Sequence, residues 1–552
     1  MPQVKSWKLH DPKAPPFPED FEVVDKAVLQ LTDIESNHNK YYAIEIHSGG
    51  ASFRVFTHYG RTDDLENDPD AGAKECRYFA SLADAQATYQ AIYREKTSPR
   101  KGYKELSLAS SRIGSAKARG TSSGQIDDAT LKKAAEAEAA KKAAAASPSK
   151  SSVPAAAHPV PAPAATSEPE APKLSAPAVD VAPEPTGWKG KLKKLVDKVT
   201  GSEATPAPVA APPAHAAADP RTYDGPLHPK VADLVEYVYA EATNALTSTV
   251  AAKITAQGIE TPLGILTLGQ IQKGEAILQD LYELFQKKKK SPESVLRLSG
   301  DFYTVVPHRI GRTRAAAQAA VIDTLEAFEQ KQETLQLMKD MLQVIGQGEG
   351  NVLFESKAHA QYEALRCEIG WVNPDNGRFK EIRDLVVNSQ IKTKAIKVQG
   401  IYTIRREPEG KAFAAHIDNQ RLLFHGSRIK NWVGILSRGI LLPKIVVSMG
   451  VNRTDAGWLG NGIYFGDAAC TSAFYTSPGK RNTRFMSVAR VALGRMKEFT
   501  KITYGLPGPP DGYQSCHGVR NKSGSPSQFA DDEYVVYSPS QQQLEYLVEF
   551  RM

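Results

Sequence analysis

The stretch LLFHGS, residues 422–427, indicates the fold of the C-terminal part of this 552-residue chain. Its apolar start, Leu422–Phe424, is typical of a buried strand. The strand ends abruptly at His425, Gly426 and Ser427, which offer an imidazole, a bare backbone and a hydroxyl group. We therefore expect a ligand to bind where this strand ends.

Two further clusters follow in the sequence. GNGIYFGD, residues 460–467, has the pattern of a second apolar strand and contains Tyr464, and DDEYVVY, residues 531–537, has the pattern of a third and contains Glu533. Each residue alone has an ordinary alternative, because a strand tyrosine is usually core, a strand-end histidine is often structural, and Glu533 alternates with apolar neighbours as a solvent-facing residue does. The ordered combination is the specific signal.

This His–Tyr–Glu order resembles the signature of the ADP-ribosyltransferase catalytic domain of the poly(ADP-ribose) polymerase family, over roughly residues 351–552. The resemblance implies cleavage of the nicotinamide–ribose bond of NAD+ and transfer of ADP-ribose to acceptor proteins, including the enzyme itself. That transition state resembles the oxocarbenium ion of glycoside hydrolysis. The site must therefore orient the amide, hold the ribose and place a carboxylate near the developing cation. The resemblance implies no metal.

Carried over residue by residue, the resemblance assigns catalytic roles to Glu533, His425 and Tyr464. Glu533 would bond a hydroxyl of the nicotinamide ribose, stabilise the cation and polarise the acceptor. His425 would hold the adenine-side ribose. Glu545 and Glu549, on the last predicted strand, are rival carboxylates.

The remaining residues of the implied site contact the nicotinamide end of NAD+ or support the histidine. Gly426 would present its backbone to the carboxamide, where a side chain would block approach. Ser472 would contact the same amide, and Tyr475 and Tyr464 would line the two faces of the ring. The expected NAD+-binding set is His425, Gly426, Ser427, Tyr464, Ser472 and Tyr475. Thr471 stands where the family often has lysine, which bears on acceptor choice and chain growth.

The composition restricts the partners and the cellular compartment that we expect for the protein. The net charge of +7 favours weak attraction to polyanions. The four cysteines are scattered without zinc-finger spacing, which indicates a reducing compartment. The N-terminus lacks the apolar run of a secretion signal, and no apolar stretch is long enough to cross a bilayer, so we expect no membrane partner. A nuclear location is expected, with the cytoplasm as the alternative.

The N-terminal region is predicted to be a small β-sheet domain. Residues 1–20 are rich in Pro and charge and are expected to be disordered. Residues 41–46 and 52–61 form a predicted hairpin around a Ser-Gly-Gly turn. Residues 81–96 have helical spacing, with Ser81 as the cap.

Residues 21–107 resemble a WGR domain, with Tyr59 in place of the signature tryptophan and with Gly60 and Arg61 matching. The resemblance implies that Tyr59 and Arg61 bind DNA ends or nicks, or contact another domain. The alternative is a half-open sheet whose arginine packs on the surface.

Residues 108–224 form a composition break dominated by Ala and Pro, which predicts a disordered linker. Near residues 187–200 lies a predicted basic amphipathic helix, with apolar Trp188 and Leu192 on one stripe and lysines around it. Such a helix binds a partner groove or nucleic acid, or forms transiently in a linker, and the sequence leaves both open.

Residues 225–349 have helical periodicity, for example at Val231, Leu234, Val235 and Val238. They resemble the helical regulatory domain that precedes the catalytic domain in DNA-activated relatives, where it restricts access of NAD+. The predicted fold class is therefore multidomain α+β: a half-open WGR sheet with a helix, a disordered linker, an all-α bundle, and a mixed-sheet ADP-ribosyltransferase fold.

Residues 350–552 are the expected catalytic domain, and LPK at 442–444 and HGV at 517–519 resemble the vault-particle branch of the family. The expected function is NAD+-dependent (poly)ADP-ribosyl transfer stimulated by DNA breaks. The alternatives are a DNA-independent mono-ADP-ribosyltransferase, a catalytically silent scaffold that binds DNA ends, and an NAD+ glycohydrolase.

Overall fold

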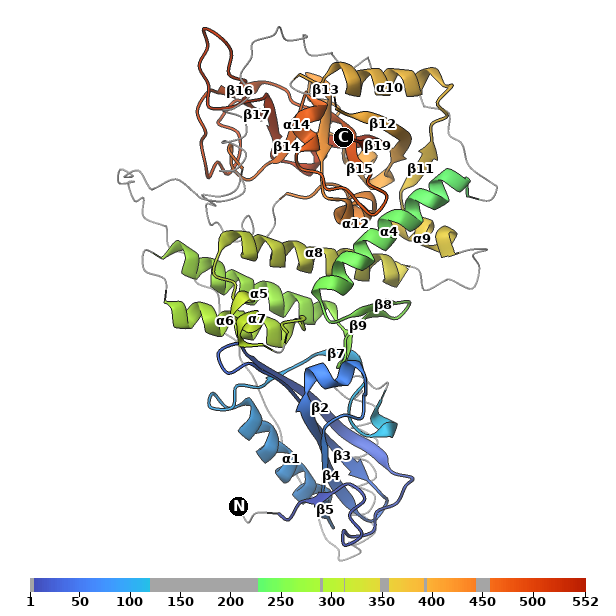
Figure 1. The fold of residues 1–552 in the computed structure, drawn as a ribbon, viewed down its shortest axis with the longest axis vertical. Coiled ribbons are helices and arrows are strands. Elements are labelled where there is room, and N and C mark those ends of the chain that lie inside the picture. Colours follow the sequence, from blue (N-terminus) through green and yellow to red (C-terminus); the bar gives the residue numbers. More distant parts are fainter. Residues whose placement is uncertain are drawn as a thin grey trace, which may run out of the picture.

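The computed structural model describes residues 4–119, 227–287, 291–311, 313–347, 357–391, 395–442 and 457–552. Its described parts form three bodies stacked along the long axis of the molecule (Figure 1). A blue sheet with one helix lies at one end, green helices lie in the middle, and a large yellow-to-red sheet lies at the other end. The predicted multidomain α+β class is confirmed. The predicted basic helix and most of the predicted linker lie outside the described residues.

The first body is a six-stranded sheet in the order β1-β5-β4-β3-β2-β6, packed against helix α1. The predicted hairpin is strands β3 and β4, paired from Lys40↔Arg61 to Ser48↔Phe53. The predicted cap is confirmed, because the Ser81 Oγ accepts a hydrogen bond from the Asp84 N–H at 3.2 Å. The elements are β1 (Trp7–Lys8), β2 (Glu22–Asp33), β3 (His38–Ser48), β4 (Phe53–Arg61), η1 (Thr62–Glu66), β5 (Ala73–Phe79), α1 (Leu82–Thr97) and β6 (Lys104–Glu105).

Two stretches predicted to be disordered are ordered where the structure describes them. In residues 4–20, strand β1 pairs with β5 at Trp7↔Cys76 and Lys8↔Glu75, so a two-residue strand joins this Pro-rich stretch to the sheet. Residues 108–119, at the start of the predicted linker, bury Leu108 and Ile113. Composition averaged over a long segment hides such short anchors.

The start of the predicted linker is held on the first sheet by a buried polar cluster. The Lys26 Nζ donates to the carbonyls of Ile113 and Ala118 at 2.9 and 2.7 Å. The Glu45 carboxylate accepts from the Ser115 N–H at 3.1 Å. Lys26 and Glu45 also form an ion pair at 3.5 Å, so each buried charge has a partner.

The second body is a bundle of helices with a small sheet that the sequence did not predict. Its sheet has the order β7-β10-β9-β8, and strand β7 comes from the end of the first body. The chain after the first domain therefore extends the sheet of the second. The elements are β7 (Leu108–Ser111), α4 (Pro229–Thr249), β8 (Lys253–Thr255), β9 (Gly258–Glu260), β10 (Gly264–Leu266), α5 (Leu268–Gln286), α6 (Pro292–Val305), α7 (Arg314–Ala319) and α8 (Leu325–Gln347). The short helix η2 (Ala116–Ala118), which follows β7, packs on β2 of the first body.

The third body is built on a nine-stranded sheet in the order β11-β12-β19-β15-β13-β14-β18-β17-β16. All described neighbours pair antiparallel except β16 and β17, which are parallel. Its strands are β11 (Glu368–Trp371), β12 (Lys397–Arg405), β13 (Gln420–Gly426), β14 (Ile463–Gly466), β15 (Arg484–Ala492), β16 (Met496–Phe499), β17 (Ser515–Gly518), β18 (Glu533–Val536) and β19 (Gln542–Arg551). Its helices are α9 (Lys357–Leu365), α10 (Gly377–Asn388), α11 (Glu407–Ala412), η4 (Ile429–Asn431), α12 (Trp432–Arg438), α14 (Ala469–Ala473) and η5 (Pro539–Gln541).

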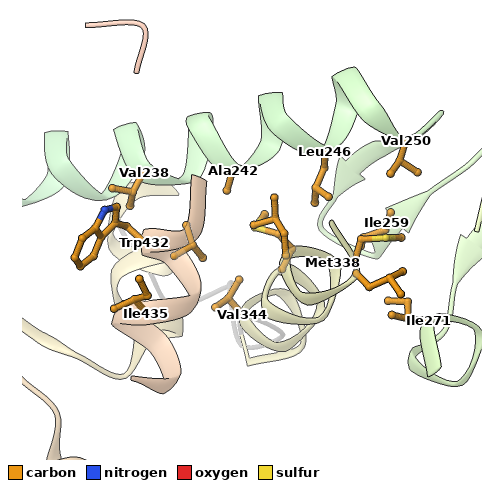
Figure 2. Packing of buried hydrophobic residues seen from close by; sticks show 14 of the residues in the cluster. Val238, Ala242, Leu246, Val250, Ile259, Ile271, Met338, Val344, Trp432 and Ile435 are labelled. Carbon is orange, nitrogen blue, oxygen red and sulfur yellow. The ribbon is translucent and has the colours of Figure 1, made fainter. Parts of the chain in front are cut away.

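One buried apolar cluster runs through all three bodies, from Val28 of β2 to Leu547 of β19. In Figure 2, α4 passes across α12 and α8, and Val238 of α4 lies beside Trp432 of α12. Trp432, which belongs to the third body, is fully buried. The helices and the large sheet therefore share a core, and their separation exposes apolar surface.

The joint between the first two bodies predicts a sharp sensitivity at Gly264. This residue has φ +147°, and a Cβ there would lie 2.0 Å from the Ser110 carbonyl oxygen of β7. We expect Gly264→Ala to cost at least about 2 kcal/mol and to lower the Tm by several degrees. The matched control is Gly269→Ala in α5, where the nearest other atom is 3.8 Å away. Equal Tm values for wild type and Gly264→Ala would mean that β7 and β10 do not pair in solution.

Candidate active site

The three predicted motif strands are neighbours in the sheet. Strand β14 pairs with β13 at Phe424↔Gly466 and with β18 at Gly466↔Glu533. Gly466 thus lies between the strand that carries His425 near its end and the strand that begins with Glu533. The sheet brings together, at one end of three neighbouring strands, residues that are more than a hundred positions apart in the sequence.

His425 is positioned by the neighbouring tyrosine strand. Its Nδ1 lies 2.9 Å from the Tyr464 carbonyl oxygen. Because a carbonyl only accepts, this nitrogen carries the proton, and Nε2 of the neutral ring is an acceptor. Burial lowers the pKa of His425, although the bond to the Tyr464 carbonyl opposes the shift. A neutral imidazole with an acceptor nitrogen suits a ribose hydroxyl.

Gly426 and Ser472 show how closely β13 approaches helix α14. A Cβ on Gly426 would lie 1.9 Å from the Ser472 carbonyl oxygen, so no other residue fits without backbone movement. The Ser472 hydroxyl donates to the Phe424 carbonyl at 2.9 Å. Its oxygen keeps acceptor capacity, which matches the N–H of a carboxamide. The neighbouring Thr471 is also buried, and its Oγ1 has no hydrogen-bond partner among the described residues.

The two tyrosines differ in exposure and in partners. The Tyr464 hydroxyl donates to the Gly460 carbonyl at 2.8 Å and accepts from the Leu459 N–H at 2.9 Å, so it fastens the turn before β14. The Tyr475 side chain is 43% exposed, which leaves a face for stacking on a planar ring. Desolvation raises the pKa of Tyr475, and the carboxylates of Glu533 and Asp531 raise it further.

Glu533 is the first residue of β18 and is partly exposed. It lies opposite glycines on both sides, Gly466 of β14 and Gly518 of β17, so neither directly paired residue carries a side chain. Desolvation raises the pKa of Tyr464 well above its ordinary value, and the Glu533 charge adds to this shift. The same charge acts on Tyr475, so the structure brings both tyrosines close to Glu533.

The rival carboxylates lie elsewhere. Glu545 is paired with Arg490 of β15 at 2.5 Å, and Glu549 lies opposite Phe485 in the same ladder. Both belong to β19, which is separated from β18 by three strands. The geometry therefore favours Glu533.

Sequence reasoning missed two residues that join the site to the helices. The Asn431 Nδ2 donates to the Ser427 Oγ at 3.1 Å and to the Glu333 carboxylate of α8 at 3.0 Å. Glu333 also pairs with Arg428 and Lys430 at 2.8 and 3.0 Å. A lone glutamate in a helix gives no signal in sequence, because its partners lie in another domain.

A second candidate site lies in the first body, where the structure places Tyr59 and Arg61 together. They line an open hollow of about 490 Å³ with Lys40, Tyr41, Tyr42, Gly60, Glu75, Arg77, Lys96 and Tyr103. The Tyr59 ring stacks on Tyr42 at 5.1 Å and 8°, and its hydroxyl donates to Glu75 at 2.7 Å. Arg61 is paired with Asp63 at 3.1 Å and stays partly exposed. The hollow combines aromatic faces with an excess of cations.

The described residues contain no group of three or more His, Cys, Asp and Glu side chains placed to hold a metal ion. Among them, no helix combines the length and the apolar character that crossing a membrane requires.

Three family models match consecutive parts of the chain. The WGR domain matches residues 25–109, the poly(ADP-ribose) polymerase regulatory domain residues 226–347, and the poly(ADP-ribose) polymerase catalytic domain residues 377–552. The chain therefore carries three domains of the poly(ADP-ribose) polymerase family, as the resemblance predicted. The last of these matches covers the part of the chain that holds His425, Tyr464 and Glu533.

Three similar proteins show which members of the family the chain resembles and over what length. "Protein mono-ADP-ribosyltransferase PARP4" of Mus musculus, the vault-type relative, is 35% identical over 328 residues, which are 59% of this chain and 16% of the relative. "Protein mono-ADP-ribosyltransferase PARP3" of Mus musculus is 26% identical over 389 residues, covering 61% of this chain and 69% of the relative. "Poly [ADP-ribose] polymerase 2" of Arabidopsis thaliana is 27% identical over 326 residues, covering 52% and 49%. The chain thus spans less than a fifth of its vault-type relative.

The site predicts a pH-dependent stability effect at Asp467, which follows β14. Burial raises the pKa of Asp467 from 3.8 to about 6, although Arg520 opposes the shift. The folded state therefore binds this proton more tightly than the unfolded state, and the resulting stability is lost as pH rises through about 6. Between about pH 4.5 and about pH 7.5 the loss amounts to about 2 kcal/mol.

We expect Asp467→Asn to raise the Tm relative to wild type near neutral pH, and to raise it less or not at all in acid, because asparagine does not titrate. Thermal unfolding at both pH values measures the difference. Exposed Asp375→Asn is the control. A Tm difference independent of pH would show that Asp467 ionises normally in the folded protein.

Proposed function

We propose that this chain transfers ADP-ribose from NAD+ to acceptor proteins, including itself, with Glu533 as the catalytic carboxylate. The observation that carries the proposal is the placement of His425, Tyr464 and Glu533 on three paired strands, with Gly466 between the outer two. This grouping of a histidine, a tyrosine and a carboxylate on paired strands favours catalysis over a scaffold with a silent transferase fold.

The residues act on the substrate in distinct ways. Gly426 presents backbone groups to the carboxamide beside Ser472, and Tyr475 offers an exposed ring face to the nicotinamide. The Nε2 of His425 accepts a hydrogen bond from a ribose hydroxyl. As the bond from ribose C1 to nicotinamide breaks, Glu533 stabilises the positive charge that develops on the sugar. It then orients the acceptor nucleophile, which bonds to C1 and releases its proton.

Transfer of a single ADP-ribose is the product that we favour over a long polymer. Thr471 stands where the family often has lysine, and its buried hydroxyl brings no positive charge to the site. The PARP4 and PARP3 relatives are named mono-ADP-ribosyltransferases, whereas the plant relative is named a polymerase. A gel of products from labelled NAD+ distinguishes one unit from a ladder.

Regulation by DNA is supported by direct contact between the first two bodies. Besides the β7–β10 pairing, the Thr32 N–H donates to the Thr304 Oγ1 at 2.7 Å, and Arg309 pairs with Glu66 at 3.3 Å. The long segment between the domains therefore does not separate the DNA sensor from the helices. DNA ends or nicks are the proposed partner of the hollow at Tyr59 and Arg61, and the nucleus is the proposed location.

Helix α8 offers a route from the helices to the NAD+ site. Glu333 reaches Ser427 through Asn431, and Asp340 binds Arg438 of α12 through two hydrogen bonds of 2.6 and 2.9 Å. We propose that these contacts hold a closed state that DNA binding loosens. A few kcal/mol suffices to keep such a state above about 99%.

The first functional prediction concerns Glu533→Gln. The change keeps the volume but removes the charge that stabilises the cation, so we expect protein labelling from NAD+ to fall by about 100-fold or more. Residual NAD+ hydrolysis is expected to survive. Labelled NAD+ measures both products, and Glu545→Gln is the matched control. Full labelling by Glu533→Gln would transfer the role to another carboxylate.

The second functional prediction concerns DNA. We expect Arg61→Ala to lose stimulation by nicked DNA while it keeps its basal activity, and the DNA affinity of the wild type to fall as salt rises. Arg100→Ala is the control, because it removes the same charge from an exposed position outside the hollow. Full stimulation of Arg61→Ala would mean that this arginine only packs against Asp63.

A further inference from the structure

A buried charged cluster surrounds the start of β18 and has no part in the function proposed so far. Its centre is Arg520, whose side chain is 7% exposed. The Arg520 Nη2 donates to the Asp467 Oδ1 at 3.2 Å and lies 3.6 Å from the Asp532 Oδ2. The Arg520 Nε lies 3.7 Å from the Asp531 Oδ1. One guanidinium thus faces three carboxylates.

The cluster joins the ends of three strands. Asp467 follows the last residue of β14, Arg520 lies two residues after the end of β17, and Asp532 directly precedes β18. The backbone N–H of Arg520 donates to the Asp532 Oδ1 at 3.0 Å, so main chain and side chain of one residue hold the same carboxylate. These three strand ends border Glu533.

His517 of β17 contacts the residues on both sides of Glu533. Its Nε2 bonds the Asp532 Oδ1 at 2.8 Å, and its ring stacks on Tyr534 at 4.5 Å and 7°. Arg421 also holds Tyr534, because its Nη1 donates a hydrogen bond to the phenol oxygen at 3.3 Å. The residue before Glu533 and the residue after it are therefore both fixed.

The charges are balanced so that the carboxylate next to Glu533 stays ionised. Burial alone would raise the pKa of Asp532, but the bonds from His517 and the Arg520 N–H lower it below its ordinary value. If Arg520 were absent, three carboxylates would face one another and Glu533 in a buried space. They belong to Asp467, Asp531 and Asp532. Like charges at such a site repel, and the strand ends would move apart.

We propose that Arg520 and His517 form a clamp that positions Glu533, by holding the two residues that flank it. This inference rests on the proposed function, because it concerns how the carboxylate is aimed at the ribose. Neither residue contacts the substrate in this role. Both act through the backbone of β18, and a misplacement of about 1 Å is enough to cost about 100-fold in rate.

The clamp is tested by separating kcat from the KM for NAD+ in four variants. We expect Arg520→Gln to lower kcat by about 10-fold or more while the KM stays within about twofold, because NAD+ binding does not require the clamp. Arg520→Lys keeps the charge and is expected to recover most of kcat. His517→Phe keeps the stacked ring but loses the bond to Asp532, and is expected to fall between wild type and Arg520→Gln.

The matched control is Arg490→Gln, which removes a partly buried ion pair from β15 and β19 of the same sheet. It is expected to lower the Tm without changing kcat. Active sites are counted by titration with carba-NAD+, so that a smaller folded fraction does not pass for a lower kcat. If Arg520→Gln does not fold, His517→Phe alone decides.

The outcomes separate the clamp from the proposed function. An active wild type with a normal kcat in His517→Phe and in any folded Arg520→Gln overturns the clamp and leaves the proposed function standing. A parallel rise in KM would also overturn it, because the residues would then act on binding. A wild type that binds carba-NAD+ but neither cleaves NAD+ nor labels protein overturns the proposed function, and the clamp with it.

Discussion

The candidate site depends on the two-sided pairing of strand β14. Four residues, Ile463–Gly466, hydrogen-bond to β18 along their whole length and touch β13 at Phe424. Because strands in a sheet lie about 4.8 Å apart, the strands that bear His425 and Glu533 are held about 10 Å apart. That spacing suits one extended ligand held at two points. Any change that shifts β14 moves both ends of the site together.

The three bodies are also joined by elements that belong to one body in sequence and to another in their contacts. Strand β7 belongs to the first body in sequence and to the second in its pairing, and Trp432 belongs to the third in sequence and to the helices in its packing. Signals between the proposed DNA site and the proposed NAD+ site need not travel through the long segment between them. The contacts already run through β10, α8 and Asn431.

Most of the fold and the motif residues were predictable because they follow from local pattern. The alternation in β3 and β4, the Ser81 cap and the three motif strands are properties of short windows. The small sheet of β8, β9 and β10 was not predictable, because each strand has three residues and its edge partner comes from another domain. Glu333 and Arg520 were missed for the same physical reason. The role of a charged side chain depends on partners that are distant in sequence.

The shared core of α4, α8 and α12 would make the proposed closed state depend on temperature. If the helices loosen, side chains such as Val238 and Trp432 meet water, and the heat capacity of the open state rises accordingly. The balance between closed and open states then curves with temperature instead of following a straight van't Hoff line. Apolar contact weakens on cooling, so the same helices restrain the site less firmly in the cold than their contacts at ambient temperature suggest.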